Sequence, residues 1–86
     1  MSYSIFYAKR AMKALKEMPG DVSKAIRKKL ELIAQAPFDP HPNVKKLQGR
    51  QGYRLRQGDW RVIYEIQQER IIILVLEIGL RKEVYR

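Results

Sequence analysis

The first part of the chain changes from a strand-like to a helical pattern of apolar residues. Residues 2–6 (SYSIF) predict a short first strand. From residue 8 onward, apolar side chains follow the i, i+3, i+4, i+7 spacing of an amphipathic helix. The residues of this apolar stripe are Ala8, Ala11, Met12, Leu15 and Met18. Charged residues fill the opposite face, so we expect one side of this helix to be buried.

A second helix is predicted after a stop at Pro19, Gly20 and Asp21. Glycine takes the left-handed conformation that ends helices, and aspartate is a good N-cap. We therefore expect Gly20 to cap the first helix and Asp21 to begin the second, which runs to about Gln35. Its apolar stripe consists of Val22, Ala25, Ile26, Leu30 and Ile33. Helices joined by so short a link form an antiparallel hairpin, and both need a sheet to cover.

The second half of the chain reads as strands. Three prolines within residues 37–43 exclude a helix there. Strands are predicted over residues 44–47, 53–56, 60–67 and 70–78, with Gly79 ending the last one and a short final strand over 81–85. The expected fold is one α+β domain over residues 1–86: a short N-terminal strand, an α-helical hairpin, and an antiparallel β-meander with the helices on one face.

The composition of the chain indicates which kinds of partner it binds and which cellular compartment it fits. The chain has 18 Lys and Arg against 9 Asp and Glu, a net charge of +9. This favours an acidic partner, such as a nucleic acid, an anionic membrane surface or an acidic protein. Cysteine is absent, which excludes disulfides and thiol nucleophiles and fits a reducing cytoplasm. The longest apolar run, residues 71–76, is far shorter than the ~20 residues of a membrane helix, and no signal-peptide core is present.

Arginines and a tyrosine recur on alternate positions of the predicted strands. Arg54 and Arg56 are two residues apart, and so are Arg81, Glu83 and Tyr85. Because side chains in a strand repeat every two residues, each set points to one face of the sheet. A cationic face that carries a tyrosine can hold a phosphodiester. RNA is therefore a candidate ligand or substrate.

The predicted hairpin decides which arginines meet. If Gln57 and Gly58 form the two-residue turn, Arg54 faces Arg61 across the ladder. Like charges directly opposite each other are unfavourable unless an anion bridges them or solvent screens them. Two alternatives stay open: an anion-binding pair, or two solvated arginines on an exposed face.

The sequence lacks the catalytic motifs of most enzyme classes. His41 is the only histidine and is expected to be solvated in its proline-rich loop. No Ser-His-Asp set, HExxH motif, metal-spaced carboxylate cluster or phosphate-binding glycine loop is present. Lysines on the helices form either a solvated face or sequence-independent contacts with RNA phosphates. Lys45 and Lys46 lie closer in sequence to the arginines, so they are better RNA-binding candidates, together with Arg56.

Two segments carry a resemblance to a known family. The chain resembles the RelE/ParE toxin superfamily, specifically its RelE-like branch, in KKLQGRQGYRLRQGDWRVIYEI and ILVLEIGLRKEVY. The resemblance extends over nearly the whole chain. It implies a RelE-like microbial RNase fold and the toxin of a type II toxin–antitoxin system. Such toxins are ribosome-dependent endoribonucleases that cut mRNA in the A site, and a cognate antitoxin silences them. The implied partners are the antitoxin, the ribosome with its rRNA, and mRNA, with no membrane and no small-molecule cofactor.

The resemblance also implies which residues take part in RNA cleavage. The catalytic candidates are Arg54, Arg61, Arg81 and Tyr85. The two strand lysines of the family fall on Arg54 and Arg56, or on Gly52 and Arg54 if the gap is placed differently. The implied mechanism needs no metal and no cofactor, because the RNA 2′-hydroxyl attacks the adjacent phosphorus. Tyr85 would be the base, Arg81 and Arg54 would stabilise the phosphorane, and Arg61 would sit near the leaving oxygen.

The chain departs from the family pattern where arginine replaces the strand lysines. Arginine keeps the charge but stays protonated at any ordinary pH, so it is a poorer proton donor. The chain also ends one residue after Tyr85, with no C-terminal helix beside the site. Both departures are expected to affect rate more than reaction type. Two other functions stay open: a ParE-like gyrase poison without nuclease activity, and a catalytically inactive binding module.

Overall fold

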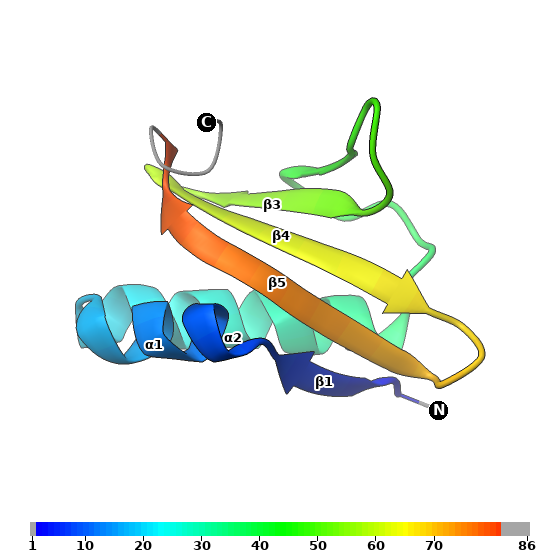
Figure 1. The fold of residues 1–86 in the computed structure, drawn as a ribbon, viewed down its shortest axis with the longest axis horizontal. Coiled ribbons are helices and arrows are strands. Elements are labelled where there is room, and N and C mark those ends of the chain that lie inside the picture. The colour runs from blue at the N-terminus through cyan, green and yellow to red at the C-terminus, as the bar shows by residue number, and fades with distance from the viewer. Residues whose placement is uncertain (1, 82–86) are drawn as a thin grey trace.

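The computed structural model shown in Figure 1 describes residues 2–81 of the 86-residue chain. Its elements, in chain order, are β1 (Ser4–Tyr7), α1 (Lys9–Glu17), α2 (Gly20–Gln35), β2 (Val44–Lys46), β3 (Tyr53–Gln57), β4 (Trp60–Gln67) and β5 (Ile72–Leu80). The predicted α+β fold is confirmed, with strand ends slightly shifted. No helix within residues 2–81 is long and apolar enough to cross a membrane.

The strands form one sheet in the order β1-β5-β4-β3-β2. The last four strands in the chain pair antiparallel with their successive neighbours, which is the predicted meander. In contrast, β1 pairs parallel with β5, so the sheet is mixed. A parallel pair needs a long crossover connection, and here both helices and three strands supply it. Both helices cover one side of the sheet (Figure 1), and we call the side away from them the open face.

The boundary between the helices differs from the prediction. Pro19 holds the N-cap position of α2, and α2 begins at Gly20 without a side-chain cap. A proline suits this position because the first N–H groups of a helix have no intrahelical partner. Asp21 is therefore not the N-cap, although it lies in the first turn, where the helix dipole favours a negative charge. Gly20 is a helical residue and not a left-handed cap of α1.

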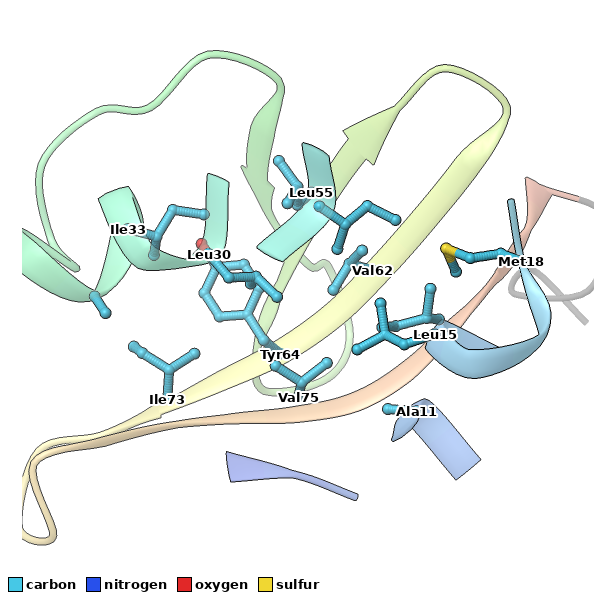
Figure 2. Packing of buried hydrophobic residues seen from close by; sticks show 13 residues of the cluster. Ala11, Leu15, Met18, Leu30, Ile33, Leu55, Val62, Tyr64, Ile73 and Val75 are labelled. Carbon is cyan, nitrogen blue, oxygen red and sulfur yellow. The ribbon is translucent and has the colours of Figure 1, made fainter. Parts of the chain in front are cut away.

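The apolar stripes of both helices pack against the sheet, as Figure 2 shows. The predicted helix residues that are buried are Ala11, Leu15, Met18, Ile26, Leu30 and Ile33. The sheet contributes residues of its three central strands: Leu55, Val62, Tyr64, Ile73, Val75 and Ile78. They alternate along each strand except at a register shift opposite Ile63 and Tyr64, which sets Val75 and Ile78 three residues apart. Because strand side chains alternate between faces, the residues between the core positions belong to the open face away from this shift.

The last strand differs from the prediction at both ends. It begins at Ile72, not at residue 70, and it continues through Gly79 to Leu80. The expectation that Gly79 ends the strand is therefore wrong. Arg81 follows the strand, and the rest of the final strand predicted over residues 81–85 lies outside the described residues.

Candidate functional site

The strand register places four basic residues on the open face. Lys45 lies opposite Arg54, and Arg56 lies opposite Arg61. Directly opposite residues point to the same face of a sheet. Leu55, between the two β3 arginines, is buried in the core on the helix side. The predicted shared face of Arg54 and Arg56 is therefore confirmed.

The turn that joins β3 to β4 consists of Gly58 and Asp59. Gln57 pairs with Trp60, so these two residues flank the turn. Gly58 has a φ of 59°, whereas Asp59 is not among the residues with positive φ. This pattern matches a type II′ hairpin turn, whose first central residue is usually glycine. The observed turn lies one residue later than the two-residue turn considered at Gln57 and Gly58.

The shifted turn changes which arginines meet. Arg54 lies opposite Ile63, so the predicted pairing of Arg54 with Arg61 is wrong. Arg56 lies opposite Arg61 instead. Both guanidinium groups stay charged at ordinary pH, and like charges directly opposite each other repel. An anion bound at this part of the open face would relieve that repulsion.

Arg61 is fixed to the turn. It is only 6% exposed, and its Nη1 donates to the carbonyl oxygens of Gly58 (2.8 Å) and Trp60 (2.9 Å). Its neighbour across the ladder in β5 is Gly79, which has no side chain and so leaves room for the guanidinium. Within residues 2–81, these two bonds use two of the five N–H donors of the guanidinium. The position of this charge is thus set before a ligand arrives, as electrostatic catalysis requires.

Arg81 reaches the same turn from the end of β5. Its backbone N–H donates to the carbonyl oxygen of Asp59 at 3.0 Å, and the preceding Leu80 pairs with Trp60. Arg81 is exposed. Figure 1 shows the end of β5 beside the start of β4. The structure therefore brings Arg61 and Arg81 to one corner of the sheet.

A hollow lies beside this corner, between β2 and β3. Its walls include Lys45, Arg54 and Arg56, together with Asn43 and Val44. Three cationic side chains around one hollow favour an anionic group such as a phosphate. Asn43 is a residue that the sequence pattern did not single out as a candidate.

Lys46 does not line this hollow. Lys46 lies opposite Tyr53, whose neighbour across β4, Tyr64, is buried in the core. Lys46 therefore belongs to the helix side of the sheet, although it is exposed. Tyr85 lies outside the described residues, so its role stays a prediction.

Two other residues have structural partners. Glu77 pairs with Arg10 of α1 at 3.5 Å, an exposed ion pair of little energetic value. His41 is not fully solvated, as expected from the sequence, but half-buried, and its Nε2 donates to the carbonyl oxygen of Ala36 at 2.7 Å. Across residues 2–81, no group of three or more His, Cys, Asp or Glu side chains could hold a metal ion.

Comparison with known proteins identifies the family of this chain. The family model described as "ParE toxin of type II toxin-antitoxin system, parDE" matches residues 5–85. The chain belongs to this toxin family. Among curated relatives of this ParE-family toxin, the mRNA interferase toxin RelE of Escherichia coli K12 is 24% identical over 87 residues, covering 99% of this chain and 92% of that protein. The putative toxin RelE1 of Methanocaldococcus jannaschii is 28% identical over 88 residues, covering 100% and 98%.

Solved structures of RelE proteins share the fold of this ParE-family toxin. The isolated E. coli RelE toxin has a TM-score of 0.80 at 26% identity, covering 98% of this chain and 92% of that one. The archaeal RelE–RelB complex from Pyrococcus horikoshii has a TM-score of 0.79 at 28% identity, covering 94% and 97%. The resemblance to the RelE/ParE superfamily is confirmed. The relatives named RelE favour the RelE-like branch over the ParE-like alternative.

Proposed function

We propose that this toxin is an mRNA interferase, a ribosome-dependent endoribonuclease that cuts messenger RNA in the A site. Relatives named mRNA interferase support this function. The observation that carries it is the corner where Arg61 and Arg81 share one turn, beside a hollow lined by further cations. A gyrase poison that acts only by protein binding would not need a fixed guanidinium at this corner.

The RNA itself supplies the nucleophile in this reaction. The 2′-hydroxyl attacks the adjacent phosphorus while the bond from phosphorus to the 5′-oxygen breaks. The products are a 2′,3′-cyclic phosphate, or its opened form, and a 5′-hydroxyl. Negative charge builds on the phosphorane oxygens, and preorganised cations stabilise it in the transition state.

Each catalytic candidate has a role in that scheme. Arg54 and Arg81 stabilise the phosphorane, and Arg61 stabilises the leaving oxygen electrostatically, because a guanidinium rarely gives up its proton. Tyr85 takes the proton from the 2′-hydroxyl, a role that rests on the family resemblance. A phenol of ordinary pKa is only about 0.1% ionised at pH 7, and nearby cations favour the phenolate.

This acid–base set is weak, so orientation of the substrate has to contribute much of the rate. The ribosome holds mRNA in a fixed conformation, and we expect little cleavage of free RNA. Lys45, Lys46 and Arg56 hold phosphates of mRNA or rRNA by charge alone. Because translated mRNA is cytoplasmic, the toxin acts in the cytoplasm.

A cognate antitoxin is the second partner in this proposal. RelE relatives from E. coli and P. horikoshii have been solved in complex with RelB. The net charge of +9 favours an acidic antitoxin, because opposite charges speed association and select the partner. An adjacent open reading frame that encodes a small acidic protein would support this partner.

The test is the double variant Arg81→Ala with Tyr85→Phe in a translation extract, where protein synthesis and new mRNA 5′ ends are measured. Removing a group that stabilises the transition state is expected to slow cleavage about 100-fold or more. Arg70→Ala is the control, because Arg70 is exposed in the turn between β4 and β5. If the double variant cleaves at the wild-type rate, the assigned site is wrong. DNA damage and filamentous cells in place of cut mRNA would instead support the gyrase alternative.

A further inference from the structure

The chain enters β2 through a tight turn that ends beside the cationic hollow. The N–H of Val44 donates to the carbonyl oxygen of His41 at 3.3 Å, which closes a four-residue turn. Pro42 and Asn43 are its central residues, and Asn43 has a φ of 64°. Proline at the first central position and a positive φ at the second are the signature of a type II turn.

Two further hydrogen bonds hold this turn in place. The carbonyl oxygen of Asn43 accepts the backbone N–H of Arg56 at 2.9 Å, so the ladder between β2 and β3 extends to Asn43. At the other end of the turn, Nε2 of His41 donates to the carbonyl oxygen of Ala36 at 2.7 Å. Asn43 is therefore fixed at the level of Arg56, and its backbone does not have to be ordered when a ligand binds.

Asn43 differs in kind from the charged residues with which it shares the hollow. Lys45, Arg54 and Arg56 attract a phosphate, which is identical in every nucleotide and carries no sequence information. A carboxamide offers both donors and an acceptor, so it can read the edge of a base. Asparagine matches adenine best, because it donates to N7 and accepts from the N6 amino group. Unstacked bases of single-stranded RNA expose that edge to proteins.

We propose that Asn43 is a specificity-determining residue that reads an adenine in the mRNA, on the nucleotide whose phosphate occupies the hollow of Lys45, Arg54 and Arg56. This role rests on the mRNA interferase activity proposed above. The cations set how tightly the mRNA is held, and Asn43 sets which base is preferred at one fixed position from the cut.

The competing explanation is that asparagine stands here only because it tolerates a positive φ. Asn43→Gly separates the two explanations, because glycine adopts this conformation readily and removes only the carboxamide. Asn43→Asp is a second variant, which keeps the size of the side chain and its tolerance of positive φ but loses the amide donors. Gln35→Ala, at the exposed end of α2, removes an amide that does not line the hollow and is the control.

The experiment maps cleavage positions on all mRNAs in a translation extract by sequencing the new 5′ ends. For the wild type and Gln35→Ala, adenine should be enriched at one fixed position relative to the cut. For Asn43→Gly and Asn43→Asp, that enrichment should fall at least about fivefold, the lower limit for losing a two-bond contact with a base. Cleavage by Asn43→Gly should fall most at sites that carry adenine at this position and least at the other sites, because the cations still hold the phosphate.

An unchanged base distribution for a folded, active Asn43→Gly variant would overturn the role of Asn43 and leave the mRNA interferase activity standing. Absence of mRNA cleavage by the wild type would overturn both. If Asn43→Gly fails to cleave, the Asn43→Asp variant tests the proposal. Full adenine enrichment in the cleavage products of Asn43→Asp would also overturn the role of Asn43 in base recognition.

Discussion

Arg61 and Arg81 are tied to adjacent carbonyl groups of a single turn. Nη1 of Arg61 donates to the carbonyl oxygen of Gly58 at 2.8 Å, and the backbone N–H of Arg81 donates to that of Asp59 at 3.0 Å. One charge comes from β4 and the other from the end of β5, and the turn sets the spacing between them. Any change that moves this turn therefore moves both arginines.

Replacing Arg61 by alanine should lower stability as well as cleavage. The substitution removes a side chain that is only 6% exposed, together with its hydrogen bonds to the carbonyl oxygens of Gly58 and Trp60. A hydrogen bond from a charged group contributes about 1.5–3 kcal/mol. Arg56→Ala is the matched control, since Arg56 is exposed on the same face and should change stability by less than about 0.5 kcal/mol. Urea denaturation measures both, and equal midpoints for Arg61→Ala and wild type would show that the bonds to the turn contribute nothing.

Gly52→Ala should be strongly destabilising. Gly52 has a φ of 118°, and an added Cβ would lie 2.9 Å from the backbone oxygen of Tyr64. The strain and the clash with backbone together should cost about 2 kcal/mol or more. Gly49→Ala is the control: its φ is also positive, at 75°, but nothing lies within 4 Å of the added Cβ. Thermal unfolding should place Gly52→Ala below Gly49→Ala, and the reverse order would show that the close approach to Tyr64 is absent.

Removing the hydroxyl of Tyr64 should stabilise the fold. Figure 2 shows this ring within the core beside Leu30, and its buried hydroxyl has no hydrogen-bond partner in the described part of the chain. Tyr64→Phe relieves that cost and should raise the free energy of unfolding by about 1 kcal/mol. Tyr53→Phe is the control, because Tyr53 stacks on Tyr64 at 5.5 Å but is only half-buried. A lower unfolding midpoint for Tyr64→Phe than for wild type would show that the hydroxyl is bonded in solution.

Stability should fall at alkaline pH because of the same residue. Burial, and to a lesser degree Tyr53, raises the pKa of Tyr64 above its ordinary value of 10.0. Below pH 10 the Tyr64 hydroxyl keeps its proton in both the folded and the unfolded state, so its protonation does not lower the free energy of unfolding. Above pH 10 the unfolded state loses it first, and stability drops by up to about 1.4 kcal/mol per pH unit until the folded pKa is passed. Burial also raises the pKa of Tyr7 and adds to the effect. Denaturation at several pH values should give a shallower decline for Tyr64→Phe, and an identical slope would contradict the assignment.

The helical layer could be predicted from the sequence because burial follows a simple period. Leu15, Ile26 and Leu30 fall on helical spacing, and all of them are buried. The parallel pairing of β1 with β5 could not be predicted in this way. The choice of partner for an edge strand depends on where the helices carry the chain, and no local pattern records that.

The β3–β4 hairpin could form its two-residue turn at residues 57–58 or at residues 58–59. Both candidate turns contain Gly58, and they differ by one residue in the cross-strand pairs. The positive φ of Gly58 at the first position of the turn selects the observed register. Lys45 and Lys46 were both named as RNA-binding candidates, but adjacent strand residues point to opposite faces, and the two-residue period could have separated them. Asn43 also had a signal in the sequence, since Pro-Asn suits the centre of a type II turn.

The parallel pairing of β1 with β5 has a consequence for synthesis of the protein. Since β5 lies between β1 and β4, the first strand made must wait for the last one before the sheet can close. An incomplete nascent chain lacks the interior strand that buries Ile73 and Val75 under the helices. A chain that is still being translated therefore cannot assemble the corner of Arg61 and Arg81 until β5 has been made.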